Sequence, residues 1–417
     1  MRDAIPRTGD TIRCVSFSFW SAIILVAVLN AEQPPQGPQP PPLTLQSAFA
    51  IAEEHNPTLV AARLGRAVDV AGIGVAGQRP NPEASFEAGR DTPHEIVSLA
   101  FPLEFGGKRA RRVDLAHATL ARTMADLAVQ SRDVRRSVRL AYFELVAAAS
   151  RVQVTSELRG FAERTRNAAR DRFESGAAPR LEALQSELAL AQADNDQEAA
   201  RGRLAAARVA LNTAIGRGPE TPAEPADTFD AGVIPGDLAA IIAAGPDIVA
   251  LDREIDEAVA RERLAVAMRR ADPTVSGGME FDSPPDFTYG WRAGVAIAIP
   301  LFTRHTADVQ VETARVAQLR ALRGARLAML TGDATAAAAR AQADRRQYLR
   351  YRDEIVPQLT TIEAMAEDSY RSGQTNLTAF LQALQAAREV RLRATDAGLE
   401  YQAALAELER ALGGPIQ

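Results

Sequence analysis

The sequence predicts a mainly helical fold with a small β part, in which long helices pack as antiparallel coiled coils. The composition is the first reason, because only 5% of the 417 residues are aromatic, and Ala, Leu, Glu, Gln and Arg dominate, as in long helices. The second reason is a proline-free stretch from residue 107 to 174, which as one helix would reach about 100 Å. The third is that two short segments alternate apolar and small residues with the period of a strand.

Residues 1–31 have the features of a secretion signal. Three arginines precede an apolar stretch from Val15 to Leu29, and the small or apolar residues up to Ala31 suit a signal peptidase. Residues 32–42 form a proline-rich spacer, for which we expect an extended backbone. No later stretch approaches the roughly 18 apolar residues that a transmembrane helix needs. The mature chain is therefore expected to cross the inner membrane and stay outside it.

Several kinds of site are excluded by residue usage. The single cysteine, Cys14, lies within the signal, so the mature chain would have neither disulfides nor thiolate metal sites. The histidines are far apart and lack the spacing of metal ligands: His55, His94, His117 and His305. No nucleophile motif or cofactor fingerprint occurs, so we expect no enzyme, no resident metal and no cofactor. The formal net charge of −5 argues against nucleic acid as a partner.

An internal repeat organises the mature chain. Landmarks of the first half recur about 190 to 198 residues later, in the same order. The pairs are Asn56-Pro57 with Gly245-Pro246, Phe101-Pro102-Leu103 with Ile299-Pro300-Leu301, residues 171–176 with 368–373, and residues 211–216 with 407–413. We predict two structural repeats, residues 43–216 and 237–413. A linker at residues 217–236 joins them, because its four prolines forbid a continuous helix, and residues 414–417 form a tail.

Each repeat is predicted to contain a helix, a pair of strands, a very long helix, a turn and a returning helix. One strand of each pair has an apolar face with period two. Its members are Val97, Leu99 and Phe101 in the first repeat, and Val295, Ile297 and Ile299 in the second. Partner strands are expected near residues 83–88 and 274–281. The long helices contain a helix weakener at equivalent places, Gly160 and Pro357, where we expect a break or bulge.

The strands suggest a membrane-embedded barrel. Only helices and closed barrels can span a bilayer, because every backbone polar group must be paired there. The strands approach the ~9 to 11 residues that a transmembrane strand requires, but one chain supplies four strands and bacterial barrels start at about eight. Several copies would have to pool their strands in a symmetric homo-oligomer. The apolar faces of the strands would then contact lipid.

The motifs together resemble the outer-membrane efflux proteins of the TolC type, from about Leu43 to Gly413. The resemblance rests on residues 43–46 (LTLQ), Asn56-Pro57, the two strand motifs, and the turns Phe173-x-x-Gly176 and Tyr370-x-x-Gly373. Residues 103–109 (LEFGGKR) are similar to a segment of the channels that serve heavy-metal resistance pumps of the cobalt-zinc-cadmium kind.

This resemblance implies a homotrimer with a twelve-stranded barrel in the outer membrane of a Gram-negative bacterium and a helical tunnel extending into the periplasm. It also implies docking to a periplasmic adaptor (membrane fusion) protein and to an inner-membrane pump of the resistance-nodulation-division type. The channel would conduct its substrate, heavy-metal cations, passively to the exterior.

The resemblance also implies roles for the turns after the long helices, which form the periplasmic tip where the adaptor docks. The tip residues would be Phe173, Gly176 and Leu181 in the first repeat, and Tyr370, Gly373 and Leu377 in the second. A gate is implied near Asp368, Tyr370 and Gln382. The family usually has an acid six residues after the tip glycine. The first repeat has Glu182 there but the second has Ala379, so the resemblance does not extend to a ring of gate carboxylates.

The junction after the first strand pair is basic. Gly106 and Gly107 would allow a sharp bend, and Lys108 with three following arginines is expected near lipid head groups. Two other functions fit parts of the sequence. A periplasmic adaptor would have one hairpin flanked by β-rich domains, whereas this chain has two hairpins. A coiled-coil scaffold would not explain the matched strand pairs.

Overall fold

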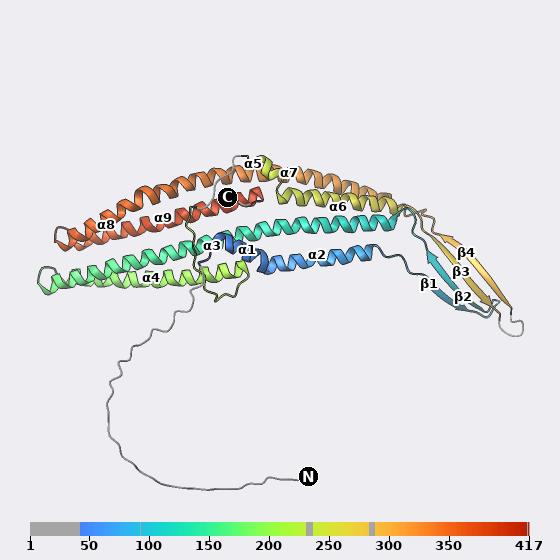
Figure 1. Ribbon diagram of the computed structural model, residues 1–417, viewed down its shortest axis with the longest axis horizontal. Coiled ribbons are helices and arrows are strands. Elements are labelled where there is room, and N and C mark those ends of the chain that lie inside the picture. The colour runs from blue at the N-terminus through green and yellow to red at the C-terminus, as the bar shows by residue number, and fades with distance from the viewer. Residues whose placement is uncertain (1–41, 92, 231–236, 283–287, 415, 417) are drawn as a thin grey trace, which may run out of the picture. The chain divides into compact units, whose positions relative to one another are not determined.

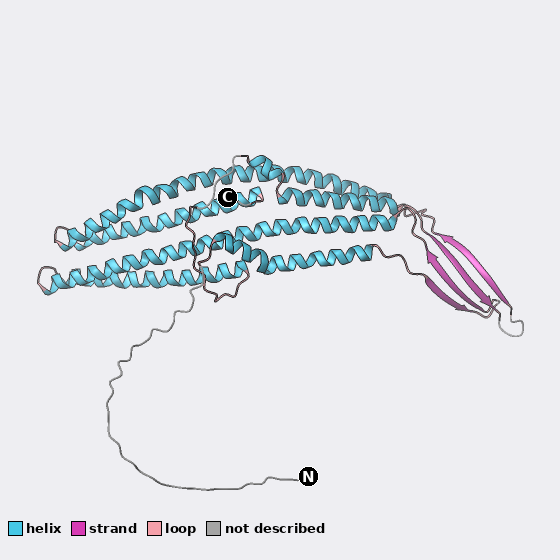
Figure 2. Cartoon of the chain, in the orientation of Figure 1, coloured by secondary structure: helices cyan, strands magenta, loops and turns pink. Residues whose placement is uncertain are grey.

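The computed structural model describes residues 42–91, 93–230, 237–282, 288–414 and 416. The predicted signal and all but the last residue of the spacer lie outside these residues. The described part is mainly helical with one small sheet, as predicted (Figures 1 and 2). No helix within it is both long and apolar enough to cross a membrane.

The two halves of the chain have the same order of elements. The first half comprises α1 (Leu45–His55), α2 (Pro57–Ala76), β1 (Glu83–Ala88), β2 (Glu95–Pro102), α3 (Lys108–Glu174) and α4 (Arg180–Ile215). The second half comprises α5 (Leu238–Ala243), α6 (Pro246–Met268), β3 (Pro273–Phe281), β4 (Tyr289–Ile297), α7 (Thr306–Arg350), the π-helix η1 (Tyr351–Ile355), α8 (Val356–Arg371) and α9 (Leu377–Leu412). The exact boundaries of the repeats stay a prediction.

The break between α1 and α2 has a local cause. Asn56 ends α1 and caps α2, because its side-chain oxygen accepts hydrogen bonds from the N–H groups of Thr58 and Leu59. Pro57 then occupies the first turn of α2, where its missing N–H costs nothing. The Asn56 amide also donates to the carbonyl of Ala214 at 2.8 Å, which ties the break to the end of α4.

α4 and α9 each end at a glycine with a positive φ, and each of these glycines packs against the start of an earlier helix, α2 or α6. Gly216 (φ 77°) lies so close to the carbonyl oxygen of His55 that a Cβ would overlap it. Gly413 (φ 76°) lies equally close to the ring of Pro246, the first residue of α6. Both halves therefore have the same junction, in which the last helix packs on the first break.

The long helices of the two halves differ. α3 runs without interruption through Gly160 over 67 residues, so the predicted break there is wrong. A helical glycine keeps its backbone hydrogen bond and costs only about 1 kcal/mol. In the second half, the π-helix η1 ends just before Pro357, as predicted. Proline lacks an N–H and clashes with the carbonyl four residues earlier, and a wider turn relieves this conflict.

The helices pack side by side with α3 in the middle (Figure 1). Near the sheet, α2 contacts α3, α3 contacts α6, and α6 contacts α7. Toward the turns, α3 contacts both α4 and α9, and α9 contacts α7 and α8. Figure 2 shows the strands at the opposite end of the long helices from the two helical turns.

An aromatic chain forms the centre of the helical core. Its successive ring centroids lie 5.3 to 6.5 Å apart, from Tyr142 through Phe143, Phe229 and Tyr348 to Tyr401. Phe229 comes from the linker. Its ring packs so closely on Gly398 of α9 that a Cβ at this glycine would overlap it. The Tyr142 hydroxyl donates to the carbonyl of Leu43 at 2.8 Å. The linker and the start of the described chain are thus both fixed to α3.

The strands form one antiparallel sheet in the order β1-β2-β3-β4. β4 ends at Ile297, which lies opposite Pro273, the first residue of β3. The prediction that Ile299 belongs to this strand is therefore wrong. Beyond Ile297 the neighbouring strand offers no partner, and Pro300 has no N–H to donate.

Candidate functional site

The register of the sheet determines which side chains share a face, because residues directly opposite each other point to the same side. One face is almost entirely apolar and exposed. Its large side chains are Phe86, Val97, Leu99, Phe101, Val275, Met279, Phe281, Tyr289, Trp291, Val295 and Ile297. Trp291 is 83% exposed and Val295 74%, so no other element among the described residues covers this face. Of the six residues predicted for the apolar face, all except Ile299 lie in strands on it.

The opposite face carries polar side chains. Ser85 and Ser98 lie 2.7 Å apart through their hydroxyls. Arg292 donates to Glu280 at 2.8 Å. Further exposed carboxylates on this face belong to Glu83 and Glu87 of β1. The sheet can therefore separate an apolar medium from an aqueous one.

Both outer strands of the sheet have an open edge. Within the part of the chain that the structure describes, β1 pairs only with β2, and β4 pairs only with β3. Open edges inside a bilayer would leave backbone N–H and C=O groups without partners, at a cost of several kcal/mol for each group. The sheet is thus complete only when its edges are paired with other strands.

A charged corner connects the sheet to the helices. Gly106 and Gly107 have φ values of 78° and 75°, which let the chain turn from β2 into α3. Lys108 is buried and donates to Asp272 at 2.6 Å, next to the start of β3. Burial alone would raise the pKa of Asp272, but the hydrogen bonds from Lys108 and from the N–H of Phe105 lower it.

The same corner uses two of the following arginines internally. Arg109 donates to the carbonyl of Gly77, and Arg112 donates to Ala76, Gln78 and Glu104. These contacts satisfy carbonyls at the end of α2. Lys108, Arg109 and Arg112 thus hold this corner together, whereas the position of the basic cluster near lipid head groups stays a prediction. Sequence reasoning predicted the bend at Gly106 and Gly107 but missed the ion pair of Lys108 with Asp272, for which the one signal was a lone lysine directly after two glycines.

Two tight turns form the far ends of the helical hairpins. Gly176 and Gly373 have φ values of 75° and 77°, and a Cβ at either would meet open space. Both reversals thus use a left-handed backbone conformation that glycine adopts without strain. In each turn the N–H after the glycine donates back into the preceding helix, from Ala177 to Arg172 and from Gln374 to Ser369.

The predicted tip residues divide into two groups. Phe173 and Leu181 are 42% and 63% exposed. Tyr370 and Leu377 are almost fully buried, in a cluster with Phe380 and Leu384. The expectation that Tyr370 and Leu377 present a docking surface is therefore not met within one chain. Leu377, Phe380 and Leu384 recur at helical spacing at the start of α9, and this apolar face packs against Tyr370. The rings of Tyr370 and Phe380 stack with their centroids 5.2 Å apart.

Tyr370 also links the two hairpins. Its hydroxyl donates to Glu182 of α4 at 2.8 Å, and its carbonyl accepts from Arg172 of α3 at 3.1 Å. Burial raises the pKa of Tyr370, and the hydrogen bond to Glu182 raises it further. Asp368 and Gln382, the other predicted gate residues, are exposed. Of these three described residues, Tyr370 is thus the one that forms hydrogen bonds between the two hairpins.

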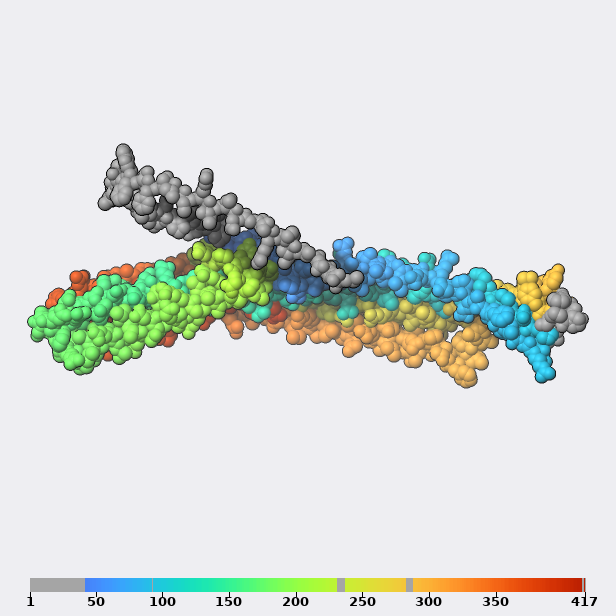
Figure 3. Space-filling model, turned by 90° about the horizontal axis from the view of Figure 1, so that it is seen from below, coloured from blue at the N-terminus to red at the C-terminus, as the bar shows by residue number. Residues whose placement is uncertain are grey.

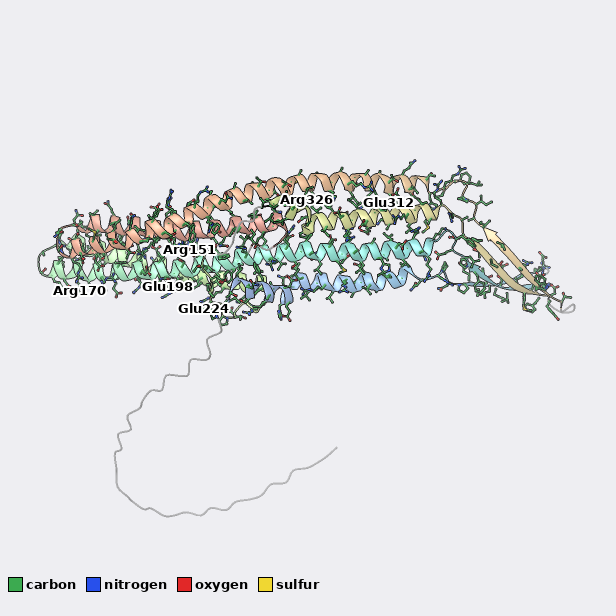
Figure 4. The ribbon with its side chains drawn as sticks, turned by 45° about the horizontal axis from the view of Figure 1, so that its top comes forward. Arg151, Arg170, Glu198, Glu224, Glu312 and Arg326 are labelled. Carbon is green, nitrogen blue, oxygen red and sulfur yellow. The ribbon has the colours of Figure 1, made fainter. Side chains whose placement is uncertain are left out.

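Ion pairs cross between the hairpins above the tips. Arg151 of α3, which is labelled in Figure 4, donates to Asp396 of α9 at 2.7 Å. Further cross-hairpin pairs include Arg164–Glu367, Arg391–Glu157 and Arg388–Asp196. Asp196 and Arg388 also line a cavity of about 390 Å³ formed by α3, α4 and α9, with Gln382 on its wall. Figure 3 shows the two hairpin tips side by side at one end of the described chain. Within the described residues, no cluster of His, Cys, Asp or Glu is arranged to hold a metal ion.

Comparison with known proteins agrees on one family. Residues 49–217 match the outer membrane efflux protein family. The cobalt-zinc-cadmium resistance protein CzcC of Cupriavidus metallidurans is 28% identical over 274 residues, which cover 64% of this chain and 65% of that protein. The chain thus spans slightly less than two thirds of this curated relative.

Two solved structures have the same fold. A structure of CusC aligns with a TM-score of 0.74 at 18% identity, covering 89% of this chain and 92% of that one. The CmeC outer membrane channel of Campylobacter jejuni aligns with a TM-score of 0.74 at 15% identity, covering 89% and 86%. The predicted fold class and the resemblance to efflux proteins, heavy-metal relatives included, are confirmed. The family consists of channel proteins rather than enzymes.

Proposed function

We propose that this chain, whose residues 49–217 belong to the outer membrane efflux protein family, is the channel subunit of a tripartite efflux system. The subunit lies in the outer membrane and extends into the periplasm. The observation that carries the proposal is the sheet, with one apolar exposed face, one polar face and two open edges, at the end of two long helical hairpins.

The open edges support a homotrimer. Pairing β1 of one copy with β4 of the next would satisfy both edges and close a ring of twelve strands. The apolar face would then contact lipid, and the polar face with Ser98, Glu280 and Arg292 would line the lumen. A passive pore needs no catalytic group, and the proposal assigns no enzyme activity, cofactor or resident metal to the chain.

The hairpin tips are the proposed contact with a periplasmic adaptor, through which an inner-membrane resistance-nodulation-division type pump would deliver substrate. Phe173 and Leu181 are exposed and would meet the adaptor directly. Gly176 and Gly373 would shape the two turns. Tyr370 and Leu377 would act from inside, by holding the second turn in place.

A gate at the same end is supported by the hydrogen bond between Tyr370 and Glu182, because it joins the two hairpins near their turns. Asp368 and Gln382 are exposed, and in the proposed gate they would face the lumen. The substrate class follows from the curated relative, whose name links it to cobalt, zinc and cadmium resistance. We therefore propose heavy-metal cations as the exported substrate, passing without a dedicated site.

Fractionation followed by conductance measurement tests this function. The protein should sediment with the outer membrane, require detergent for extraction, and form discrete ion-conducting channels in planar bilayers. A strain lacking the gene should become sensitive to divalent heavy metals, and the intact gene should restore resistance. A soluble periplasmic protein without channel activity would contradict the proposal and favour an adaptor or a scaffold.

A further inference from the structure

A histidine and a carboxylate meet at the end of the sheet that lies far from the long helices. His94 directly precedes β2 and Asp282 directly follows β3 (Figure 1). The Nδ1 atom of His94 lies 3.6 Å from Oδ1 of Asp282. These two residues come next after Glu95 and Phe281, which are the last paired positions of the two strands. Because side chains alternate along a strand, both belong to the polar face.

The two oxygens of the Asp282 carboxylate have different surroundings. Oδ2 accepts a hydrogen bond from the hydroxyl of Thr288 at 2.5 Å. Oδ1 is buried and has no hydrogen-bond partner among the described residues. Nδ1 of His94, at 3.6 Å, is beyond the range of a hydrogen bond. A buried carboxylate oxygen in this state marks a position where a water molecule or an ion completes the contacts.

The spacing of the two atoms suits a shared metal cation. Nitrogen and oxygen atoms bind zinc at about 2.0–2.1 Å, so two ligands of one tetrahedral ion lie about 3.3 Å apart. His94 and Asp282 would have to approach each other by only a few tenths of an ångström. An imidazole nitrogen also favours zinc, cobalt and similar ions over magnesium. The pair thus has the chemistry and nearly the geometry of two zinc ligands.

Two other histidines lie near a carboxylate, and their geometry is different. Nδ1 of His305 lies 2.7 Å from Oδ2 of Asp308, which is an ordinary hydrogen bond within the first turn of α7. Nδ1 of His55 lies 3.9 Å from the neighbouring Glu54, and both side chains are more than half exposed. Of these three contacts, the one at His94 is the one that joins two strands and includes a buried carboxylate oxygen without a hydrogen bond.

The polar face of the sheet would attract cations toward this pair. In the described strands it carries the carboxylates of Glu83, Glu87 and Glu280 and the guanidinium of Arg292. Arg292 is paired with Glu280 at 2.8 Å, so the face has a net negative charge. Glu87 and Glu280 both lie opposite Ile96, two positions along β2 from His94. A cation moving along this face toward the strand turns would therefore pass acidic side chains before it reaches the pair.

We propose that His94 and Asp282 form a weak site for a divalent transition-metal cation of the zinc class, at the exit end of the lumen. The inference rests on the proposed channel function and deepens it by naming a contact that the exported cation makes. Two protein ligands are fewer than a resident metal centre uses, and no larger ligand group lies together in the described part of the chain. The site is thus a transient contact, and such weak binding is what conduction favours.

Zinc titration of the detergent-solubilised full chain tests the site, with calorimetry as the readout and magnesium as the comparison ion. His94→Ala removes the nitrogen ligand. Asp282→His replaces the carboxylate by a second imidazole, which breaks a His–Asp ion pair but supplies a good zinc ligand. His55→Ala is the matched control, because it removes an exposed histidine that also lies beside a carboxylate. The same proteins are then examined in planar bilayers, with zinc added to each side in turn.

We expect the wild-type protein to bind zinc more tightly than magnesium. His94→Ala should weaken zinc binding at least about tenfold, because loss of a direct ligand should cost no less than loss of a supporting contact. Asp282→His should retain or strengthen binding, and His55→Ala should leave it unchanged. In bilayers, zinc should reversibly lower the current of the wild-type protein at concentrations that do not affect His94→Ala.

Zinc binding by His94→Ala at the wild-type affinity would overturn the inference. So would loss of binding in both His94→Ala and Asp282→His, because the pair would then be a structural ion pair. An equal response to magnesium would reduce the effect to the charge of the face and would also overturn it. In all three cases the channel function stands. Absence of ion-conducting channels in every protein would contradict the channel function instead, whereas calorimetry would still report on the site. Asp282→Cys, with a thiolate ligand, repeats the exchange if Asp282→His does not assemble.

Discussion

The hydroxyl of Tyr370 on α8 donates a hydrogen bond to Glu182 on α4 across 2.8 Å, and this contact joins the two helical hairpins beside their turns. Both groups are largely buried, and the guanidinium of Arg172 lies 5.2 Å from the Tyr370 ring centroid. Opening the tip would have to break this bond.

Tyr370→Phe should therefore loosen the tip without removing the stacked ring. We expect a loss of about 0.5–1.5 kcal/mol in the free energy of unfolding and a larger mean conductance in planar bilayers. Glu182→Gln should have a similar effect, and the double variant should be little worse than either single one. Tyr351→Phe, at the π-helix, serves as the control and should leave conductance unchanged. Additive effects of the two substitutions would show that the pair does not act as one link.

Gly176→Val and Gly373→Val test the turns. Because open space surrounds both positions, the expected cost comes from positive φ alone and should be about 1 kcal/mol or more. Oligomers should still reach the outer membrane, whereas crosslinking to the adaptor and heavy-metal resistance should fall together. Gly160→Ala, in the middle of α3, should keep both activities. Full docking and export in both Val variants would place the docking surface elsewhere.

Arginine substitutions in β4 test the two faces of the sheet. Val295→Arg should cost about 2–4 kcal/mol near the membrane midplane, because Val295 lies on the apolar face. Ala296→Arg, one residue further on the polar face, should cost clearly less. The costs of both substitutions are measured by the yield of protein in the outer membrane and by the denaturant midpoint of the reconstituted protein. Equal losses would mean that the assignment of faces is wrong.

Lys108→Met tests the corner between sheet and helices. The variant leaves Asp272 without its ammonium partner, and we expect a loss of about 1–2 kcal/mol at neutral pH, since Asp272 is partly exposed. The pKa of Asp272 is lowered in the folded protein, so its contribution is present above its unfolded pKa of about 3.9 and disappears as pH falls through the folded value. The free energies of unfolding of the wild-type protein and of Lys108→Met should therefore converge at acidic pH. A difference that persists unchanged below that range would contradict this role.

Much of the fold could be predicted because its signals are local and occur twice. Period-two alternation identified the apolar faces of β2 and β4, and the internal repeat together with the family resemblance identified the turns at Gly176 and Gly373. The end of β4 was placed too late, because apolar alternation continues to Leu301 although Pro273 leaves no pairing partner there. Gly160 was overinterpreted, since a long coiled-coil helix tolerates one glycine.

The contacts that the sequence did not reveal are those between distant residues. Lys108 and Asp272 are 164 positions apart, and Tyr370 and Glu182 are 188 apart. The inward orientation of Tyr370 and Leu377 depends on how α8 and α9 pack on α3 and α4, and no local pattern contains that information. The turns were therefore predictable, whereas the exposure of their side chains was not.

The number of copies in the detergent-solubilised protein is the most direct test of the account. The described residues of each chain form four strands with two open edges, so the proposed channel requires copies that pair β1 with β4. Native mass measurement should give three copies per particle, and cysteines introduced at facing positions on β1 and β4 should crosslink neighbouring chains. A stable monomer that retains folded β-structure in detergent and conducts ions would contradict the account.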